Sequence, residues 1–259
     1  MLANLAYYAF FKLEDLPLAK SQLHEIFAKT NVRGTIIIAQ EGLNCNLAGE
    51  QAELKNGFKA FLELWNLDKS EEKWSTSLVN PFDRFQVKVK KEICTLGLPE
   101  IDVQKWRAPY IEASDLKAKI KNGLSDTLLM DNRKKFEYDM GSFQGAVPVD
   151  NPVFSRFPEY ADKIEEEHGK EKEIIMFCTG GIRCEKAGAY MRSRGFKNVK
   201  QLKGGILRYF EEEGANSYEG NCFVFDGRGL VDPELKAAGQ GIGLLPYNLV
   251  PIHLKDYSS

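Results

Sequence analysis

The sequence predicts an α/β protein with two domains, an α+β domain at the N-terminus and a parallel-sheet α/β domain after it. In the first 90 residues, strand and helix patterns alternate, and prolines then interrupt the periodicity around residues 95–110. Beyond that point, buried apolar runs such as 174–177 alternate with helical segments, as in a parallel sheet. The expected boundaries are 1–95 for the N-terminal domain, 96–110 for a linker, 111–212 for the second domain and 213–259 for a C-terminal extension.

The N-terminal domain shows the order strand, helix, strand, strand, helix, strand. Its strands are expected at residues 5–13, 34–40, 45–48, 75–79 and 85–89, and its helices at 16–29 and 54–65. The first segment is rich in aromatic residues, which favour strands, and the helical segments carry apolar residues at helical spacing. This is the order of the split βαβ unit, so the sequence predicts a ferredoxin-like α+β domain.

The second domain alternates strands with helices. Strands are expected at residues 127–130, 147–149, 174–177 and 199–202, and helices at 111–121, 159–167, 184–194 and up to Phe210. Ligand sites in parallel sheets lie at the carboxyl ends of strands. The residues that follow strand 174–177 are therefore the first place to look for chemistry.

The composition is that of an ordinary globular protein of 259 residues, with 43% hydrophobic and 28% charged residues. A net charge of −2 gives no overall signature of nucleic-acid binding, so any such surface must be local. No apolar run approaches the length of a membrane span, and the N-terminus lacks the pattern of a signal peptide. We therefore expect no membrane partner.

The five cysteines are scattered and none forms a CxxC pair, so neither a zinc ribbon nor a disulfide framework is expected. This usage is typical of a reducing cytoplasm, which is the expected compartment. The three histidines are far apart, and no GxGxxG motif follows a strand. No metal, flavin or dinucleotide site is therefore expected.

Cys178 stands between the apolar strand 174–177 and a predicted helix. The loop that follows it consists of Thr179, Gly180, Gly181, Ile182 and Arg183. Backbone N–H groups in such a loop form a nest that attracts anions, and the helix N-terminus and Arg183 add positive potential. A free thiol has a pKa of about 8.5, which falls by several units in such a setting. Cys178 is therefore the predicted catalytic thiolate, and the alternative is a buried cysteine without chemistry.

Four residues separate Cys178 from Arg183, one fewer than in cysteine-dependent phosphatases. This smaller cradle suits a thiolate that carries one extra sulfur atom. Residues 127–210 resemble a rhodanese domain, through Asp131-x-Arg133, Glu137, Gly141-x-x-x-Gly145-Ala146, the Cys178 loop and Gly204-Gly205. We expect Asp131 and Arg133 to stabilise this domain by ion pairing. The resemblance makes the second domain a rhodanese-type parallel α/β domain.

A narrower resemblance covers most of the chain. It rests on Glu41-Gly42-Leu43-Asn44, Val87-x-Val89-Lys90-Lys91, the run from Cys178 to Lys186, and Cys222-Phe223-Val224-Phe225-Asp226-x-Arg228. Together these motifs resemble the bacterial tRNA uridine hydroxylases, in which a ferredoxin-like domain precedes a rhodanese domain. Many members continue into a cysteine-rich tail, whereas residues 229–259 contain no cysteine. No role of that tail in binding tRNA or metal is therefore carried over.

The resemblance implies an enzyme that converts the wobble uridine of tRNA (position 34) to 5-hydroxyuridine. It also implies tRNA as a partner, and molecular oxygen and a reductant as co-substrates. The fold and the Cys178 loop alone would favour a sulfurtransferase, because a fold does not fix a function. A non-catalytic module that uses only the anion cradle is a further alternative. The N-terminal domain and the family resemblance favour tRNA hydroxylation.

Two further sets of residues have alternative roles. Cys184, just past Arg183, is either a second thiol that resolves an oxidised Cys178 into a disulfide or a small packing residue. Lys88, Lys90 and Lys91 form a basic stripe that is either a solvated face or an RNA contact. The other candidate phosphate contacts are Arg192 and Arg194.

Overall fold

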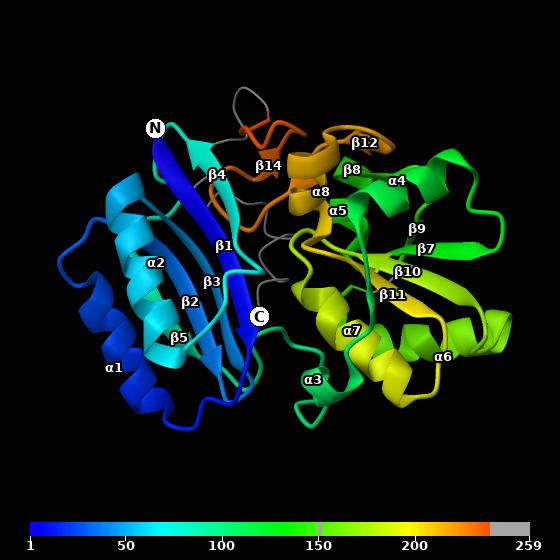
Figure 1. The fold of residues 1–259 in the computed structure, drawn as a ribbon, viewed down its shortest axis with the longest axis horizontal. Coiled ribbons are helices and arrows are strands. Elements are labelled where there is room, and N and C mark those ends of the chain that lie inside the picture. The colour runs from blue at the N-terminus through cyan, green and yellow to red at the C-terminus, as the bar shows by residue number, and fades with distance from the viewer. Residues whose placement is uncertain (150–151, 239–259) are drawn as a thin grey trace. The chain divides into compact units, whose positions relative to one another are not determined.

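The computed structural model describes residues 1–149 and 152–238, so residues 239–259 of the predicted C-terminal extension lie outside the described residues. The chain divides into two compact units (Figure 1). The first comprises Met1–Ile93 and Phe225–Gly229, and the second comprises Cys94–Val224 and Leu230–Leu235. No helix in the described ranges combines the length and the apolar character needed to cross a membrane.

The first unit contains one sheet with two helices. Its elements are β1 (Leu2–Phe10), α1 (Leu16–Phe27), β2 (Arg33–Ala39), β3 (Gly42–Gly49), α2 (Gln51–Trp65), β4 (Lys73–Ser77) and β5 (Phe85–Val89). The strand order is β4-β1-β3-β2-β5, and β5 is parallel to its neighbour β2. The strands β4-β1-β3-β2 are antiparallel and have the ferredoxin-like order, so the predicted fold class is confirmed, and β5 extends this sheet at its edge.

The core of this unit forms because β1 and α2 bury aromatic side chains against each other. Alternate residues of β1, such as Leu5 and Tyr7, join the core, and Phe58 and Phe61 from α2 meet them. The ring of Tyr7 lies 5.1 Å from that of Phe58 in an edge-to-face arrangement. Such an aromatic pair contributes about 0.5–1.5 kcal/mol beyond the stabilisation that comes from burying the apolar area of the two rings. The helices thereby cover one face of the sheet.

The second unit is built on a parallel sheet with the strand order β6-β11-β10-β7-β9. These strands are β6 (Tyr110–Ile111), β7 (Thr127–Asp131), β9 (Val147–Pro148), β10 (Glu173–Phe177) and β11 (Val199–Leu202). Every pair in this sheet is parallel, as predicted. The remaining elements are α3 (Val103–Trp106), α4 (Ala113–Lys121), α5 (Lys135–Met140), the 3₁₀ helix η1 (Phe154–Arg156), α6 (Phe157–His168), α7 (Ile182–Ser193) and α8 (Gly205–Glu213). Two small antiparallel pairs join β8 (Gly141–Phe143) to β12 (Tyr218–Gly220) and β13 (Cys222–Phe223) to β14 (Leu230–Val231).

Helices cover both faces of this sheet, so its central strand β10 is apolar on both sides. Ile174 and Met176 belong to a core that includes residues of α6 and α7. Ile175 and Phe177 belong to a second core that includes residues of α4 and α8. This arrangement explains the unbroken apolar run at residues 174–177, because alternate residues enter different cores.

Residues 96–110, for which the sequence predicts a linker, contain α3 and the start of β6. Leu96 and Ala108 are fully buried in the core beside α7. Glu185 of α7, which has no exposed surface, accepts hydrogen bonds from Arg107 Nε at 3.2 Å and from the Tyr110 hydroxyl at 2.5 Å. This segment therefore packs on the second unit and fixes the helix that follows the Cys178 loop.

Candidate active site

The reactive loop lies at the carboxyl end of β10, where the sequence predicts it. Cys178 directly follows Phe177, and α7 begins at Ile182, two residues earlier than predicted. The earlier start has a local cause, since the carbonyl of Gly181 accepts the N–H groups of Cys184 at 2.9 Å and Glu185 at 3.2 Å. The loop before α7 is therefore short, and its N–H groups can point towards the sulfur of Cys178.

The sulfur of Cys178 is buried, with 1% exposure, and its neighbours favour the thiolate. The Gly181 N–H donates to Sγ at 3.2 Å. Burial opposes ionisation, but a hydrogen bond from Cys184, the charge of Arg183 and the backbone N–H groups of both residues outweigh it. Together they lower the pKa of Cys178 to about 5. This geometry favours the predicted thiolate of Cys178 at neutral pH.

The start of α8 holds the backbone of this loop in place. The N–H of Ile206 donates to the carbonyl of Cys178 at 3.0 Å, and that of Leu207 donates to the carbonyl of Thr179 at 3.1 Å. Gly205 makes this contact possible, because a Cβ there would lie 2.5 Å from the Cys178 oxygen. With the loop carbonyls bound by α8, its N–H groups are left to face the sulfur.

Arg183 is held in place by a buried carboxylate. Its guanidinium donates to both oxygens of Glu137, at 2.8 and 2.9 Å. Burial raises the pKa of Glu137, but the charges of Arg183 and Arg133 more than offset it, so that this pKa is lowered. The bidentate pair fixes the direction of Arg183, and its positive charge still acts on Cys178.

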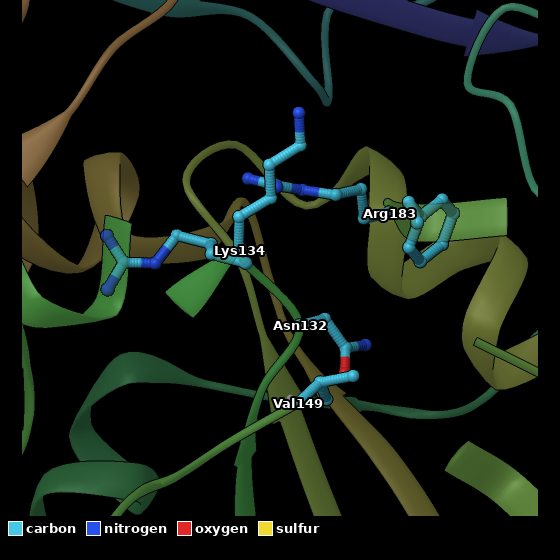
Figure 2. Close-up of a pocket in the computed structure, with 6 residues that line it drawn as sticks. Asn132, Lys134, Val149 and Arg183 are labelled. Atoms are coloured by element: carbon cyan, nitrogen blue, oxygen red, sulfur yellow. The ribbon is translucent and has the colours of Figure 1, made fainter. Parts of the chain in front are cut away.

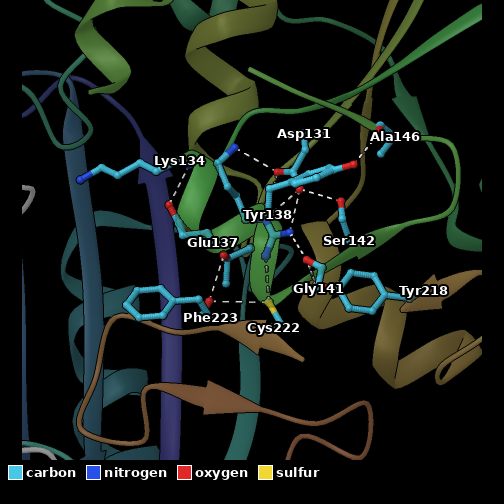
Figure 3. A network of polar contacts seen from close by, with 12 residues as sticks. Asp131, Lys134, Glu137, Tyr138, Gly141, Ser142, Ala146, Tyr218, Cys222 and Phe223 are labelled. Carbon is cyan, nitrogen blue, oxygen red and sulfur yellow. Dashed lines mark hydrogen bonds and ion pairs between the residues drawn. The ribbon is translucent and has the colours of Figure 1, made fainter. Parts of the chain in front are cut away.

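Asp131 and Arg133 form the buried ion pair that the sequence suggests. Both side chains have no exposed surface, and Nη2 of Arg133 lies 2.7 Å from Oδ2 of Asp131. Figure 3 shows the network around them, in which Arg133 also donates to the carbonyl of Gly141 and the Ser142 hydroxyl donates to Asp131. This pair thus acts within the fold, where it links the end of β7 to β8, and Nη1 of Arg133 also lies 3.9 Å from the Cys222 sulfur in β13.

A small cavity of about 10 Å³ lies beside Arg183, lined also by Asn132, Arg133, Lys134, Val149 and Phe154 (Figure 2). Lys134 is half-buried there, and although Glu137 opposes the shift, burial and the nearby Arg183 lower its pKa to about 8. Asn132 is buried, and its Nδ2 lies 3.6 Å from Cys184 Sγ. Sequence reasoning missed Asn132 and Lys134, because single polar residues after a strand carry no periodic signal. Their place directly after β7, beside the reactive loop of a parallel sheet, is the signal that could have found them.

The remaining predicted site residues lie in two places. Lys88, Lys90 and Lys91 are exposed at the end of the edge strand β5, just after Val87, which enters the core. Arg192 and Arg194 lie at the opposite end of α7 from Cys178, and a helix of 12 residues is about 18 Å long. Arg194 already pairs with Asp162 and Glu165. The structure does not bring these two arginines to the reactive loop.

No group of three or more His, Cys, Asp or Glu side chains within residues 1–149 and 152–238 is arranged to hold a metal ion. The chemistry visible at the site is that of an anionic sulfur in a ring of N–H donors beside a fixed guanidinium. Such a site can act as a nucleophile or can carry a further sulfur or oxygen atom on Cys178.

Comparison with known proteins identifies both units. The UPF0176 acylphosphatase-like domain matches residues 2–93, and the rhodanese-like domain matches residues 112–212. A tRNA uridine(34) hydroxylase of Bordetella petrii is 39% identical over 91% of this chain and 95% of its own length. One of Variovorax paradoxus is 41% identical over 90% of both chains. The chain therefore belongs to the tRNA uridine(34) hydroxylase family.

Proposed function

We propose that this protein hydroxylates the wobble uridine of tRNA, at position 34, to 5-hydroxyuridine, with Cys178 as the reactive thiol. The observation that carries this proposal is the buried Cys178 thiolate in its ring of N–H donors, in a chain that matches two of its relatives over nine-tenths or more of their length. Molecular oxygen and a reductant are the co-substrates that the family resemblance implies. The cytoplasm, where tRNA is found, is the compartment in which we expect the protein to act.

In this proposal the second unit holds the target base near Cys178, and the first unit contributes phosphate contacts. Bases of an anticodon loop can be splayed out of their stack and stacked or hydrogen-bonded in a protein site. Lys134 and Arg183 supply positive charge on the rim of the cavity beside the loop. Lys88, Lys90 and Lys91 are the exposed cations of the first unit that we assign to the RNA backbone.

The test is mass spectrometry of tRNA nucleosides from cells that lack this gene and its relatives and that express the protein or a variant. We expect the wild type to restore 5-hydroxyuridine and Cys178→Ala to leave it undetectable. Cys45→Ala is the matched control, since Cys45 is buried in the first unit and burial raises its thiol pKa to about 12. This control should restore the nucleoside. If Cys178→Ala restores it equally well, the proposed role of Cys178 is wrong.

The competing sulfurtransferase function is tested with the same protein. A sulfurtransferase would take sulfane sulfur from thiosulfate onto Cys178 and pass it to cyanide as thiocyanate. If the wild type turns over thiosulfate and leaves the 5-hydroxyuridine content of tRNA unchanged, the sulfurtransferase replaces the hydroxylase as the proposal.

A further inference from the structure

Cys184 lies in the first turn of α7, directly beside the reactive sulfur. Its thiol is hydrogen-bonded to Cys178, and the two side chains have 0% and 1% exposed surface. If Cys184 served only to fill space, any side chain of similar small volume would serve at this position. A second sulfur within hydrogen-bond reach of a thiolate also offers chemistry, because a thiol can attack an oxidised sulfur that it already touches.

Asn132 holds Cys184 from the side of β7. Its Nδ2 lies 3.6 Å from Cys184 Sγ and 3.3 Å from the sulfur of Met176. Its Oδ1 is buried and has no hydrogen-bond partner among the described residues, which is costly for an amide oxygen. A half-turn of the amide exchanges the two atoms, so that Oδ1 can accept the Cys184 S–H. The same side chain can thus stabilise either the thiol or the thiolate of Cys184.

We propose that Cys178 and Cys184 form a dithiol–disulfide couple, in which Cys184 resolves an oxidised Cys178 and so protects the site from irreversible oxidation. The proposal rests on the proposed role of Cys178 as the reactive thiol. It extends that role to the regulation of the same site by peroxides, which arise wherever oxygen is reduced.

The cycle balances in three steps. The Cys178 thiolate attacks a peroxide, ROOH, whose O–O bond breaks, and with one proton taken up it gives the sulfenic acid of Cys178 and ROH. Cys184 then forms an S–S bond to Cys178, and the hydroxyl leaves as water with the Cys184 proton. A cellular dithiol reduces this disulfide by exchange, becoming a disulfide itself and restoring both cysteines.

The negative charge on Cys178 keeps Cys184 protonated as long as Cys178 is a thiolate. Burial, and then the hydrogen bond and charge of the Cys178 thiolate, raise the pKa of Cys184 well above its usual value. Oxidation of Cys178 to a neutral sulfenic acid removes the last two of these causes. The charge of Arg183 and the hydrogen bond from Asn132, which lower this pKa, remain. Cys184 therefore becomes a better nucleophile only after Cys178 has been oxidised.

The loop between the two cysteines can make the small shift that a bond requires. A disulfide has an S–S length of about 2.05 Å, so the sulfurs must move closer than their hydrogen-bonded distance. Gly180 lies in this loop, and apart from its chain neighbours no described residue has a heavy atom within 4 Å of where its Cβ would be. Its backbone has the freedom of glycine and open space around it.

The experiment treats the fully reduced full-length protein with one equivalent of hydrogen peroxide, without tRNA, and blocks the remaining thiols before digestion with trypsin. Because Arg183 lies between the cysteines, trypsin separates them into peptides Glu173–Arg183 and Cys184–Lys186. We expect these two peptides to be joined by a disulfide that a dithiol reverses. A Cys178 link to any other cysteine, or a Cys178 sulfinic acid in its place, overturns the proposal.

Three variants sharpen this result. In Cys184→Ser, Cys178 should accumulate as a sulfenic acid that dimedone traps, and excess peroxide should then add 32 daltons in all, the mass of two oxygen atoms. Cys94→Ser is the matched control, because the half-buried Cys94 also acts on Arg183, and it should leave the Cys178–Cys184 link unchanged. Asn132→Ala should slow disulfide formation roughly two- to tenfold while leaving sulfenic acid formation unchanged. Equal rates of Cys178 over-oxidation in the wild type and Cys184→Ser would refute the resolving role.

These readouts are independent of hydroxylation. If the protein forms the disulfide but makes no 5-hydroxyuridine, the dithiol–disulfide couple is supported and the proposed hydroxylase function is wrong. If it makes 5-hydroxyuridine but never forms the disulfide, the proposed function is supported and the dithiol–disulfide couple is wrong. Since the wild-type peptide map alone decides the couple, poor folding of a variant leaves it testable.

Discussion

At the scale of single residues, the geometry of the site depends on a buried ion pair, in which Glu137 fixes the orientation of Arg183. Glu137 is fully buried and Arg183 nearly so, and the two form a bidentate ion pair. Removing one partner of such a pair leaves an uncompensated charge in a medium that solvates it poorly. The direction of Arg183, and with it the positive potential at Cys178, is therefore coupled to the stability of the second unit.

Glu137→Gln should destabilise the protein by about 3–5 kcal/mol at pH 7. The pKa of Glu137 is lowered in the folded state from 4.5, so its stabilising effect is complete above that value and is lost as the pH falls through the lowered folded pKa. The stability gap between wild type and variant should therefore shrink only below about pH 4.5. Urea unfolding followed by circular dichroism, repeated across pH, measures this gap.

The control for this prediction is Glu159→Gln, which breaks the exposed pair of Glu159 with Arg156. A surface pair of this kind contributes about 0–1 kcal/mol, so the loss should be much smaller. Equal losses in the two variants would mean that the buried pair has no special role.

At the scale of elements, the active loop is positioned by the start of α8 as much as by its own sequence. Gly204 and Gly205 both have a φ of +68°, and Gly205 packs directly under the carbonyls of Cys178 and Thr179. A side chain at Gly205 would push the loop away from α8. The N–H groups that stabilise the Cys178 thiolate would then lose their direction.

Gly205→Ala should therefore raise the pKa of Cys178 from about 5 towards the usual value of a thiol. The pH dependence of Cys178 alkylation, followed by mass spectrometry, measures this shift. Gly214→Ala is the matched control, since Gly214 ends the same helix with a φ of +63°. Apart from its chain neighbours, no heavy atom of the described residues lies within 4 Å of its Cβ position. Its φ is likewise positive, so an alanine is strained there too, but without the clash. If both variants shift the alkylation profile alike, strain in α8 rather than contact with the loop is responsible.

Sequence reasoning located the elements that show a periodic pattern of apolar residues or a recognisable motif. The apolar run before Cys178, the loop and the pair of glycines after β11 all lie where expected, because strands and tight loops are encoded locally. The contact between Asn132 and Cys184 could not be predicted, since it joins the residue after β7 to the first turn of α7, which only the fold brings together. The sequence places the basic residues Arg192 and Arg194 beyond the helix that follows the Cys178 loop, and they lie at the far end of α7.

At the scale of the whole molecule, a net charge of −2 must be reconciled with binding to an RNA backbone. The charge is distributed unevenly, since Lys88, Lys90 and Lys91 stand together at the edge of the first sheet and are exposed. A local cluster of this kind can attract phosphates even when the total charge is slightly negative, because screening limits each charge to about 8–10 Å at physiological salt.

Replacing Lys88, Lys90 and Lys91 together by Gln should weaken tRNA binding by the full-length protein and reduce its salt dependence. Each lost phosphate contact lowers the slope of log affinity against log salt by about 0.7–0.9. The triple variant should thus lose about two units or more of slope, measured by filter binding across a salt series. Arg194→Gln is the control, because Arg194 is engaged by Asp162 and Glu165 at the far end of α7, and its slope should match that of the wild type. A slope that falls in the arginine variant and not in the lysine variant would move the RNA contact from β5 to the end of α7.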